Sequence, residues 1–184
     1  MLIETERTPN PATLKFLPGR PVSPGGTRDF ATPESGDAAP LARDLFALGD
    51  VERVFFGEDF ITVTKAPGSA DWETLKIDVL GLIMDHLASG SPMQVGQEVE
   101  VETFDDPADA DVVAQIRDLL ETRIRPAVAN DGGDIIYRGF QRGVVFLQLQ
   151  GSCAGCPSST ATLKGGIENL LRHYVPEVSE VRAI

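Results

Sequence analysis

The sequence predicts an α+β protein made of two small α/β domains, each a helix-hairpin-helix arrangement on a small sheet, joined by an acidic linker. Three observations predict this organisation. Apolar residues recur at helical spacing in four stretches, β-branched and aromatic runs flank two short turns, and a run of acidic residues separates the two sets. We place the domains at residues 1–95 and 109–184 and the linker at residues 96–108.

The first domain is expected to begin with two short strands. Residues 2–8 and 13–16 are rich in β-branched and apolar side chains, and residues 9–11 form a Pro-Asn-Pro turn between them. Residues 18–40 are dense in Pro and Gly, which predicts a loop around at most a short strand near Phe30.

A helix, a hairpin and a second helix complete the first domain. Residues 40–48 have helical apolar spacing, with Pro at the start and Gly immediately after the end. The runs 51–56 and 60–65 flank a Gly-Glu-Asp turn and predict a β-hairpin. Residues 71–90 then predict a helix with an Asp N-cap and a terminal Gly. The aromatic residues of the hairpin are expected in the core: Phe55, Phe56 and Phe60.

The linker is predicted because acidic residues follow one another with no basic residue among them, so the segment repels itself and stays solvated. These residues are Glu98, Glu100, Glu102, Asp105, Asp106, Asp109 and Asp111. A brief edge strand at residues 98–101 is the alternative.

The second domain repeats the order of the first. Residues 109–128 predict a helix that Pro126 breaks or restarts. A hairpin of residues 134–140 and 144–149 follows, then a helix at 158–174 and a last strand at 177–182. An ancient duplication is a hypothesis that the pattern suggests, and a different strand order in the two halves would exclude it.

Charge is unevenly distributed along the chain. Residues 1–107 hold 8 Lys and Arg against 19 Asp and Glu, a formal charge of −11, whereas residues 108–184 hold 8 against 9, a charge of −1. An acidic half argues against nucleic-acid binding, which needs a basic surface. Apolar runs are shorter than the roughly 18 residues that span a bilayer, so no membrane partner is expected. The start of the chain resembles no targeting sequence. We expect a soluble protein of the bacterial cytoplasm, or of the mitochondrial matrix if a presequence has been removed.

The two cysteines of the chain, Cys153 and Cys156, lie on a turn between a predicted strand and a predicted helix. A helix start favours negative charge, so thiolates there become reactive or bind metal. Structural zinc takes four ligands and a cubane iron–sulfur cluster takes four cysteines. His86 and His173 have no ligand-like spacing to the pair. The missing ligands are therefore expected from a second chain.

By itself the Cys-x-x-Cys motif fits redox, zinc or iron chemistry. A thiol-disulfide oxidoreductase also places such a motif between a strand and a helix, but here Pro157 follows the pair and the element order is not βαβ. A structural zinc site shared by a dimer is the other alternative. The sequence has no phosphate-binding loop and no nucleophile–base arrangement, so we assign no catalytic residue and expect no enzyme.

Several motifs stand around and after the cysteines: residues 131–134 (Asp-Gly-Gly-Asp), 151–159, 162–168 and 176–178. Together they resemble the NifU C-terminal domain of iron–sulfur scaffold and carrier proteins. The first half is similar to the N-terminal domain of the Nfu subgroup, through residues 8–11, 14–16, 40–42, 54–57 and 59–65. The resemblance covers nearly the whole chain. It departs at Gly165-Gly166, where the family more often has a single Gly.

This resemblance implies a homodimer that holds a labile 4Fe-4S cluster between its protomers through Cys153 and Cys156. It also implies transfer of the cluster to apo iron–sulfur proteins, with other cluster-assembly factors as partners. Zinc can replace the cluster in a purified sample. The ligand count from the residues themselves requires a second chain as well.

Overall fold

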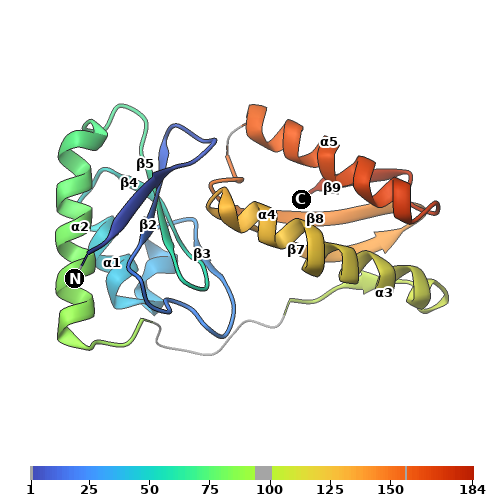
Figure 1. Ribbon diagram of the computed structural model, residues 1–184, viewed down its shortest axis with the longest axis horizontal. Helices are drawn as coiled ribbons and strands as arrows, with labels where there is room; N and C mark the ends of the chain where they lie inside the picture. The colour runs from blue at the N-terminus through green and yellow to red at the C-terminus, as the bar shows by residue number, and fades with distance from the viewer. Residues whose placement is uncertain (1, 94–100, 156) are drawn as a thin grey trace. The chain divides into compact units, whose positions relative to one another are not determined.

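The structure is a computed structural model that describes residues 2–93, 101–155 and 157–184 (Figure 1). Contacts divide the chain into two compact units, Met1–Glu98 and Val99–Ile184. Each unit combines helices with its own sheet, so the chain is α+β, as the sequence predicts. Among the described residues, no helix has both the length and the apolar composition needed to cross a bilayer.

The first unit holds a five-stranded sheet of order β1-β2-β5-β4-β3. The strands are β1 (Glu4–Arg7), β2 (Thr13–Leu17), β3 (Arg28–Phe30), β4 (Val51–Phe56) and β5 (Ile61–Lys65). All neighbouring pairs are antiparallel. The structure therefore confirms the two short strands at the start of the domain, the hairpin of β4 and β5, and the short strand near Phe30.

Helices cover one face of this sheet (Figure 1). They are the 3-10 turn η1 (Glu34–Ala38), α1 (Pro40–Phe46) and α2 (Trp72–Ser89). α2 ends at Gly90, whose φ of 68° is the left-handed conformation that a terminal Gly adopts readily. Asp71 occupies the N-cap position, but its side chain makes no capping hydrogen bond.

The core of the first unit lies between the helices and the sheet. Leu41 and Leu45 of α1 and Val79 and Ile83 of α2 pack there against the strands, all with 0% exposure. The predicted core phenylalanines are buried as well, but of the three only Phe56 belongs to this core, whereas Phe55 and Phe60 pack against each other with ring centroids 5.9 Å apart. The alternation of the strands and the 3.6-residue period of the helices account for this packing.

The second unit holds a four-stranded sheet of order β6-β7-β8-β9. β7 (Gly133–Gln141) and β8 (Val144–Gly151) form the predicted antiparallel hairpin. The outer strands β6 (Phe104–Asp105) and β9 (Glu180–Ala183) each run parallel to their neighbour. β9 begins three residues later than predicted, but it closes the sheet as expected.

A helical layer covers one face of the second sheet (Figure 1). α3 (Ala110–Leu119) continues through the π-helical segment η3 (Leu120–Ile124) into α4 (Arg125–Asn130), and α5 (Pro157–Tyr174) packs beside them. Pro126 lies in the first turn of α4, where a missing N–H is tolerated. Of the two alternatives for Pro126, the helix restarts there, and the wider π turn accommodates the change.

Part of the predicted linker is folded. β6 pairs with β7, and the short helix η2 (Pro107–Asp109) follows it. The carboxylate of Asp105 accepts hydrogen bonds from the Tyr137 hydroxyl and from the Phe140 amide, the latter at 3.1 Å. These donors stabilise an acidic residue that the sequence pattern assigns to solvent. Most of the alternative edge strand, residues 98–100, lies outside the described residues.

The duplication hypothesis is wrong, because the two units have different strand orders. The outer neighbour of β5 is β2, which precedes the hairpin in the sequence, whereas the outer neighbour of β8 is β9, which follows the last helix. In addition, β3 is antiparallel to β4 but β6 is parallel to β7.

Candidate metal centre

Cys153 lies on the turn between β8 and α5, where the sequence places it. β8 ends at Gly151, which pairs with Gly133 at the start of β7. Gly151 and Gly155 have φ of 65° and 80°, a left-handed conformation that reverses the chain before α5. Cys156 lies outside the described residues. The described half of the motif therefore consists of a single thiol on a glycine-bounded turn.

Hydrogen bonds attach this turn to the start of β7 and to α5. The Ser152 amide donates to the Gly132 carbonyl at 3.2 Å, and the Ser152 hydroxyl donates to the Asp131 carbonyl. The Thr160 hydroxyl of α5 donates to the Cys153 carbonyl at 2.9 Å. The turn is thus held from both sides, which fixes the Cys153 backbone.

The Cys153 side chain points into the second unit. It is 6% exposed and belongs to the core of that unit. Gly133 provides the space for it, because a Cβ at this position would lie 2.6 Å from Cys153 Sγ and 2.7 Å from the Gln150 carbonyl oxygen. Close approach therefore explains why glycine stands at residue 133 of the Asp-Gly-Gly-Asp turn.

Burial raises the pKa of the Cys153 thiol from 9.0 to about 11. The nearby Ser152 hydroxyl lowers this pKa in part, whereas the charges of Asp131 and Asp134 raise it. We expected the helix start to favour the thiolate, but in this conformation desolvation outweighs it. At neutral pH the thiol is protonated, and a metal must displace its proton to bind.

This pKa predicts slow alkylation of Cys153 at neutral pH. In a Cys156→Ala variant, the rate of reaction with iodoacetamide should rise between pH 9 and about 11, because only the thiolate reacts. The same variant in denaturant should titrate near the ordinary value of 9.0. A folded-state rate that has already levelled off below pH 9 would contradict the buried, protonated thiol.

A buried ion pair adjoins the cysteine turn. Asp134, which follows Gly133, is 3% exposed, and Arg125 of α4 contacts both of its carboxylate oxygens, with Nε at 2.9 Å and Nη2 at 2.8 Å. The Ile135 amide donates to the same carboxylate at 2.8 Å. The hydrogen bonds that Arg125 donates to the Asp134 carboxylate raise the pKa of Arg125 further above its ordinary value. The charged clamp ties α4 to the start of β7.

No sequence pattern indicates this clamp. The Gly pair of residues 131–134 indicates a turn with unusual backbone angles or close packing, and the structure has both, a φ of 81° at Gly132 and the close approach at Gly133. Arg125 stands nine residues before Asp134, in a helix with several other charged residues, so spacing alone does not pair them. Two glycines beside an acidic residue at a strand start are the one feature that could have indicated a buried carboxylate.

The two histidines do not join Cys153. His86 belongs to the first unit and is buried at 8% exposure. His173 contacts Tyr174 edge to face, with ring centroids 4.9 Å apart, near the end of α5. That position is about 24 Å along the helix from Pro157. Within residues 2–93, 101–155 and 157–184, no three His, Cys, Asp or Glu side chains form a metal-binding group.

The fold and the site define a protein of two α+β units, in which the first cysteine of a Cys-x-x-Cys motif lies on a strand–helix turn. Family models match both units: "Scaffold protein Nfu/NifU N terminal" over residues 3–90 and "NifU-like domain" over residues 116–182. The human protein "NFU1 iron-sulfur cluster scaffold homolog, mitochondrial" is 52% identical over 184 residues, which cover 100% of this chain and 72% of that protein. The chain therefore belongs to the NifU/Nfu family, which confirms the resemblance in its motifs.

Other relatives agree with this assignment. "NifU-like protein 5, mitochondrial" of Arabidopsis thaliana is 48% identical over 185 residues, covering 98% of this chain and 67% of that protein. Among solved structures, a solution NMR structure of a NifU-like protein from Saccharomyces cerevisiae matches with a TM-score of 0.46 and 24% identity. That match covers 53% of this chain and 87% of the yeast chain.

Proposed function

We propose that this protein is an iron–sulfur cluster scaffold and carrier, in which Cys153 and Cys156 of two protomers hold a labile 4Fe-4S cluster that passes to apo-proteins. The observation that carries the proposal is the Cys-x-x-Cys motif of a NifU/Nfu family member, whose first thiol, Cys153, lies on a strand–helix turn. Two chains together supply the four thiolates that a cubane cluster takes. The names of the relatives as iron–sulfur cluster scaffolds support the same class. The cluster is cargo, so no catalytic residue is needed.

The environment of Cys153 supports a cargo that can be released. A scaffold has to bind its cluster strongly enough to protect it and weakly enough to surrender it. A thiol with a pKa of about 11 holds its proton in competition with iron at neutral pH, which lowers the apparent affinity. Separation of the protomers would halve the number of protein ligands. An acceptor thiolate could then replace Cys153 or Cys156 by ligand exchange.

An exposed face of small residues on α5 supports the dimer. Gly165 and Gly166 lie in mid-helix, where each costs about 1 kcal/mol relative to Ala. A Cβ at either position would meet nothing within 4 Å. The unit itself therefore does not require these glycines. Close approach of a second α5 would require them. This helix begins beside the cysteine turn.

The two alternatives make different demands on the thiols. Catalytic cysteines of thiol-disulfide oxidoreductases have lowered pKa values, whereas that of Cys153 is raised. This disfavours the redox alternative. A zinc site shared by two chains would use the same four thiolates, so only metal analysis separates it from the cluster.

Anaerobic reconstitution with ferrous iron and sulfide tests the proposal. We expect about two iron atoms and two sulfide ions per chain, together with the visible absorption of an iron–sulfur cluster. About one zinc ion per two chains without sulfide uptake would indicate the structural zinc protein. Reduction of a model disulfide by the dithiol form, without cluster uptake, would indicate the oxidoreductase.

Gly133→Ala should impair cluster binding, although the substitution adds only a methyl group. The new Cβ would stand 2.6 Å from Cys153 Sγ and 2.7 Å from a backbone oxygen, so the thiol and the β8 end must shift. We expect iron uptake to fall by at least about half, because ligand geometry tolerates little displacement. Gly81→Ala is the control for the substitution itself, since Gly81 belongs to the first unit and its Cβ would meet nothing within 4 Å. Unchanged iron uptake by Gly133→Ala would contradict the described geometry.

Location is part of the proposal. The human and Arabidopsis relatives are named mitochondrial, which supports the mitochondrial matrix as the alternative to the bacterial cytoplasm. The domain boundaries at residues 95 and 109 also stay a prediction. The family models stop at residue 90 and resume at residue 116.

A further inference from the structure

α2 of the first unit has a second apolar face, opposite the one it buries. Toward the sheet it presents Leu75, Val79 and Ile83, which are at most 2% exposed. On the other side, Ile77 is 71% and Met84 is 43% exposed. We name this side the outer stripe, and its exposed members follow one another at intervals of four, three and four residues: Ile77, Gly81, Met84 and Ala88. That spacing is the seam that one helix offers to another.

Gly81 stands in the middle of the outer stripe. A glycine within an 18-residue helix costs about 1 kcal/mol relative to Ala, and a Cβ at Gly81 would meet nothing within 4 Å. The first unit therefore has no packing reason to keep glycine there. Close approach of another helix at this point would supply one, because two backbones can then come nearer than side chains normally allow.

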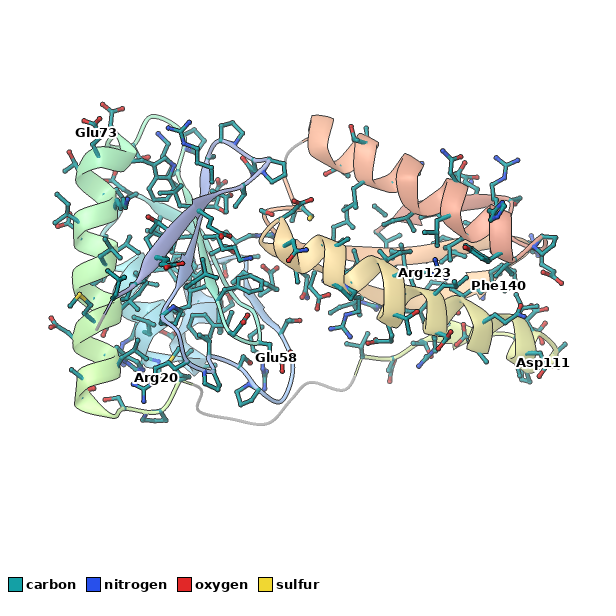
Figure 2. All side chains as sticks on the ribbon, in the orientation of Figure 1. Arg20, Glu58, Glu73, Asp111, Arg123 and Phe140 are labelled. Carbon is teal, nitrogen blue, oxygen red and sulfur yellow. The ribbon has the colours of Figure 1, made fainter. Side chains whose placement is uncertain are left out.

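Acidic residues flank one edge of the outer stripe. Asp78 and Asp85 are exposed and lie seven residues apart, two turns along the same edge. Within the described residues neither forms an ion pair. The surrounding unit is acidic too, since residues 2–93 hold 8 Lys and Arg against 14 Asp and Glu. In Figure 2, Glu73 at the start of α2 also points away from the sheet. The flank therefore favours a basic occupant.

A second copy of α2 fits this edge poorly. In an antiparallel pair of identical helices, the edge that carries Asp78 and Asp85 in one copy lies beside the same edge of the other copy. Asp78 of one copy would therefore face Asp85 of the other. This contact would repeat across the twofold axis, and like charges at such positions are destabilising. The charges therefore select a different chain as the occupant.

We infer that the outer stripe of α2 docks an amphipathic helix of another protein, with its apolar side on Ile77, Gly81 and Met84 and basic residues toward Asp78 and Asp85. The recognition mode is a helix laid along a helix, with apolar anchors and a charged flank. This surface belongs to the first unit and does not depend on the cluster chemistry of the second. It gives the family's N-terminal domain a way to select partners.

Two synthetic peptides test the inference on the full-length chain. Both have Leu at the seam positions of three heptads, and one carries Lys where the other carries Glu on the flank. We expect the Lys peptide to bind at least about fivefold more tightly and to shift amide resonances of α2. The preference should shrink at high salt, because exposed charges are screened.

Substitutions then assign the contacts. Ile77→Ser with Met84→Ser should weaken binding of the Lys peptide roughly tenfold or more, since these are the apolar anchors. Asp78→Lys with Asp85→Lys should reverse the peptide preference. Glu52→Lys with Glu58→Lys is the matched control, because both residues are exposed on other elements, and it should keep the preference. Gly81→Ala should raise the melting temperature of the first unit and weaken peptide binding.

Three results would overturn the inference. The first is equal binding of both peptides, and the second is a Lys-peptide affinity that Ile77→Ser with Met84→Ser leaves unchanged. The third is a dimer of the full-length chain that the same double substitution dissociates, since a second copy would then be the occupant. All three leave iron uptake by the cysteines untouched, so they are separate from a failure of the cluster proposal.

Discussion

Replacing Cys153 or Cys156 by alanine should abolish cluster binding and leave both units folded. Each substitution removes two of the four thiolates in a dimer, and a cubane cluster is not held by the remaining two. The structural cost is small. Cys153 is a buried side chain of modest size, and its truncation should lower the free energy of unfolding by about 1 kcal/mol.

Iron and sulfide content after anaerobic reconstitution measures the binding, and circular dichroism measures the fold. Ala154→Ser is the matched control, because it changes the neighbouring residue without removing a thiol or a side-chain hydrogen bond of the turn. It should reduce cluster content far less than either cysteine substitution. A full iron–sulfur absorption band in Cys153→Ala or Cys156→Ala would contradict the assignment of the site.

Arg125→Met should lower the free energy of unfolding of the second unit by about 3 kcal/mol. The substitution leaves the carboxylate of Asp134 buried with its main charged partner removed, and an unpaired buried charge is strongly destabilising. Arg172→Met is the control. Arg172 is exposed and lies 3.8 Å from Glu168, so its loss should cost less than about 0.5 kcal/mol.

Intrinsic fluorescence and near-ultraviolet circular dichroism separate the two units. The single tryptophan, Trp72, reports on the first unit, and the two tyrosines, Tyr137 and Tyr174, report on the second. Arg125→Met should lower the tyrosine transition by more than about 10 °C and leave the tryptophan transition unchanged. The double variant Arg125→Met with Asp134→Leu should recover part of the loss, because neither charge is then buried alone. A single Arg125→Met that melts like the wild type would show that the clamp is not structural.

The regular elements could be predicted from local signals. The hairpin of β4 and β5 follows from two β-prone runs around a short turn, and α2 follows from its helical spacing and terminal glycine. The Cys153 turn was predicted for the same reason, since β8 and α5 have different periods on either side of it. These signals act within a few residues, so the sequence carries them directly.

Features that depend on distant residues escaped prediction. Asp105 was assigned to a solvated linker because its neighbours are acidic, but Tyr137 and Phe140, more than thirty residues away, provide its donors. The burial of His86 depends likewise on how α2 sits on its sheet. The strand orders that exclude a duplication are also set by pairing at long range. Composition and period do not encode such contacts.

In the candidate site, too, some features follow from local sequence signals and others depend on distant residues. Its thiols were found from their position on a turn, whereas the raised pKa of Cys153 arises from burial that no motif reveals. The contact between Gly133 and Cys153, twenty residues apart, and the clamp from Arg125 to Asp134 are tertiary as well. They explain why the Asp-Gly-Gly-Asp turn stands beside the cysteines.

Native mass spectrometry of the 184-residue chain after anaerobic reconstitution shows whether two chains share one cluster. One spectrum counts the chains, the iron atoms and the sulfide ions of each species. We expect the cluster only on a species of two 19.8 kDa chains, and we expect Cys153→Ala to remove this species. A complete cluster on a single chain, or a dimer that carries metal without sulfide, would contradict this expectation.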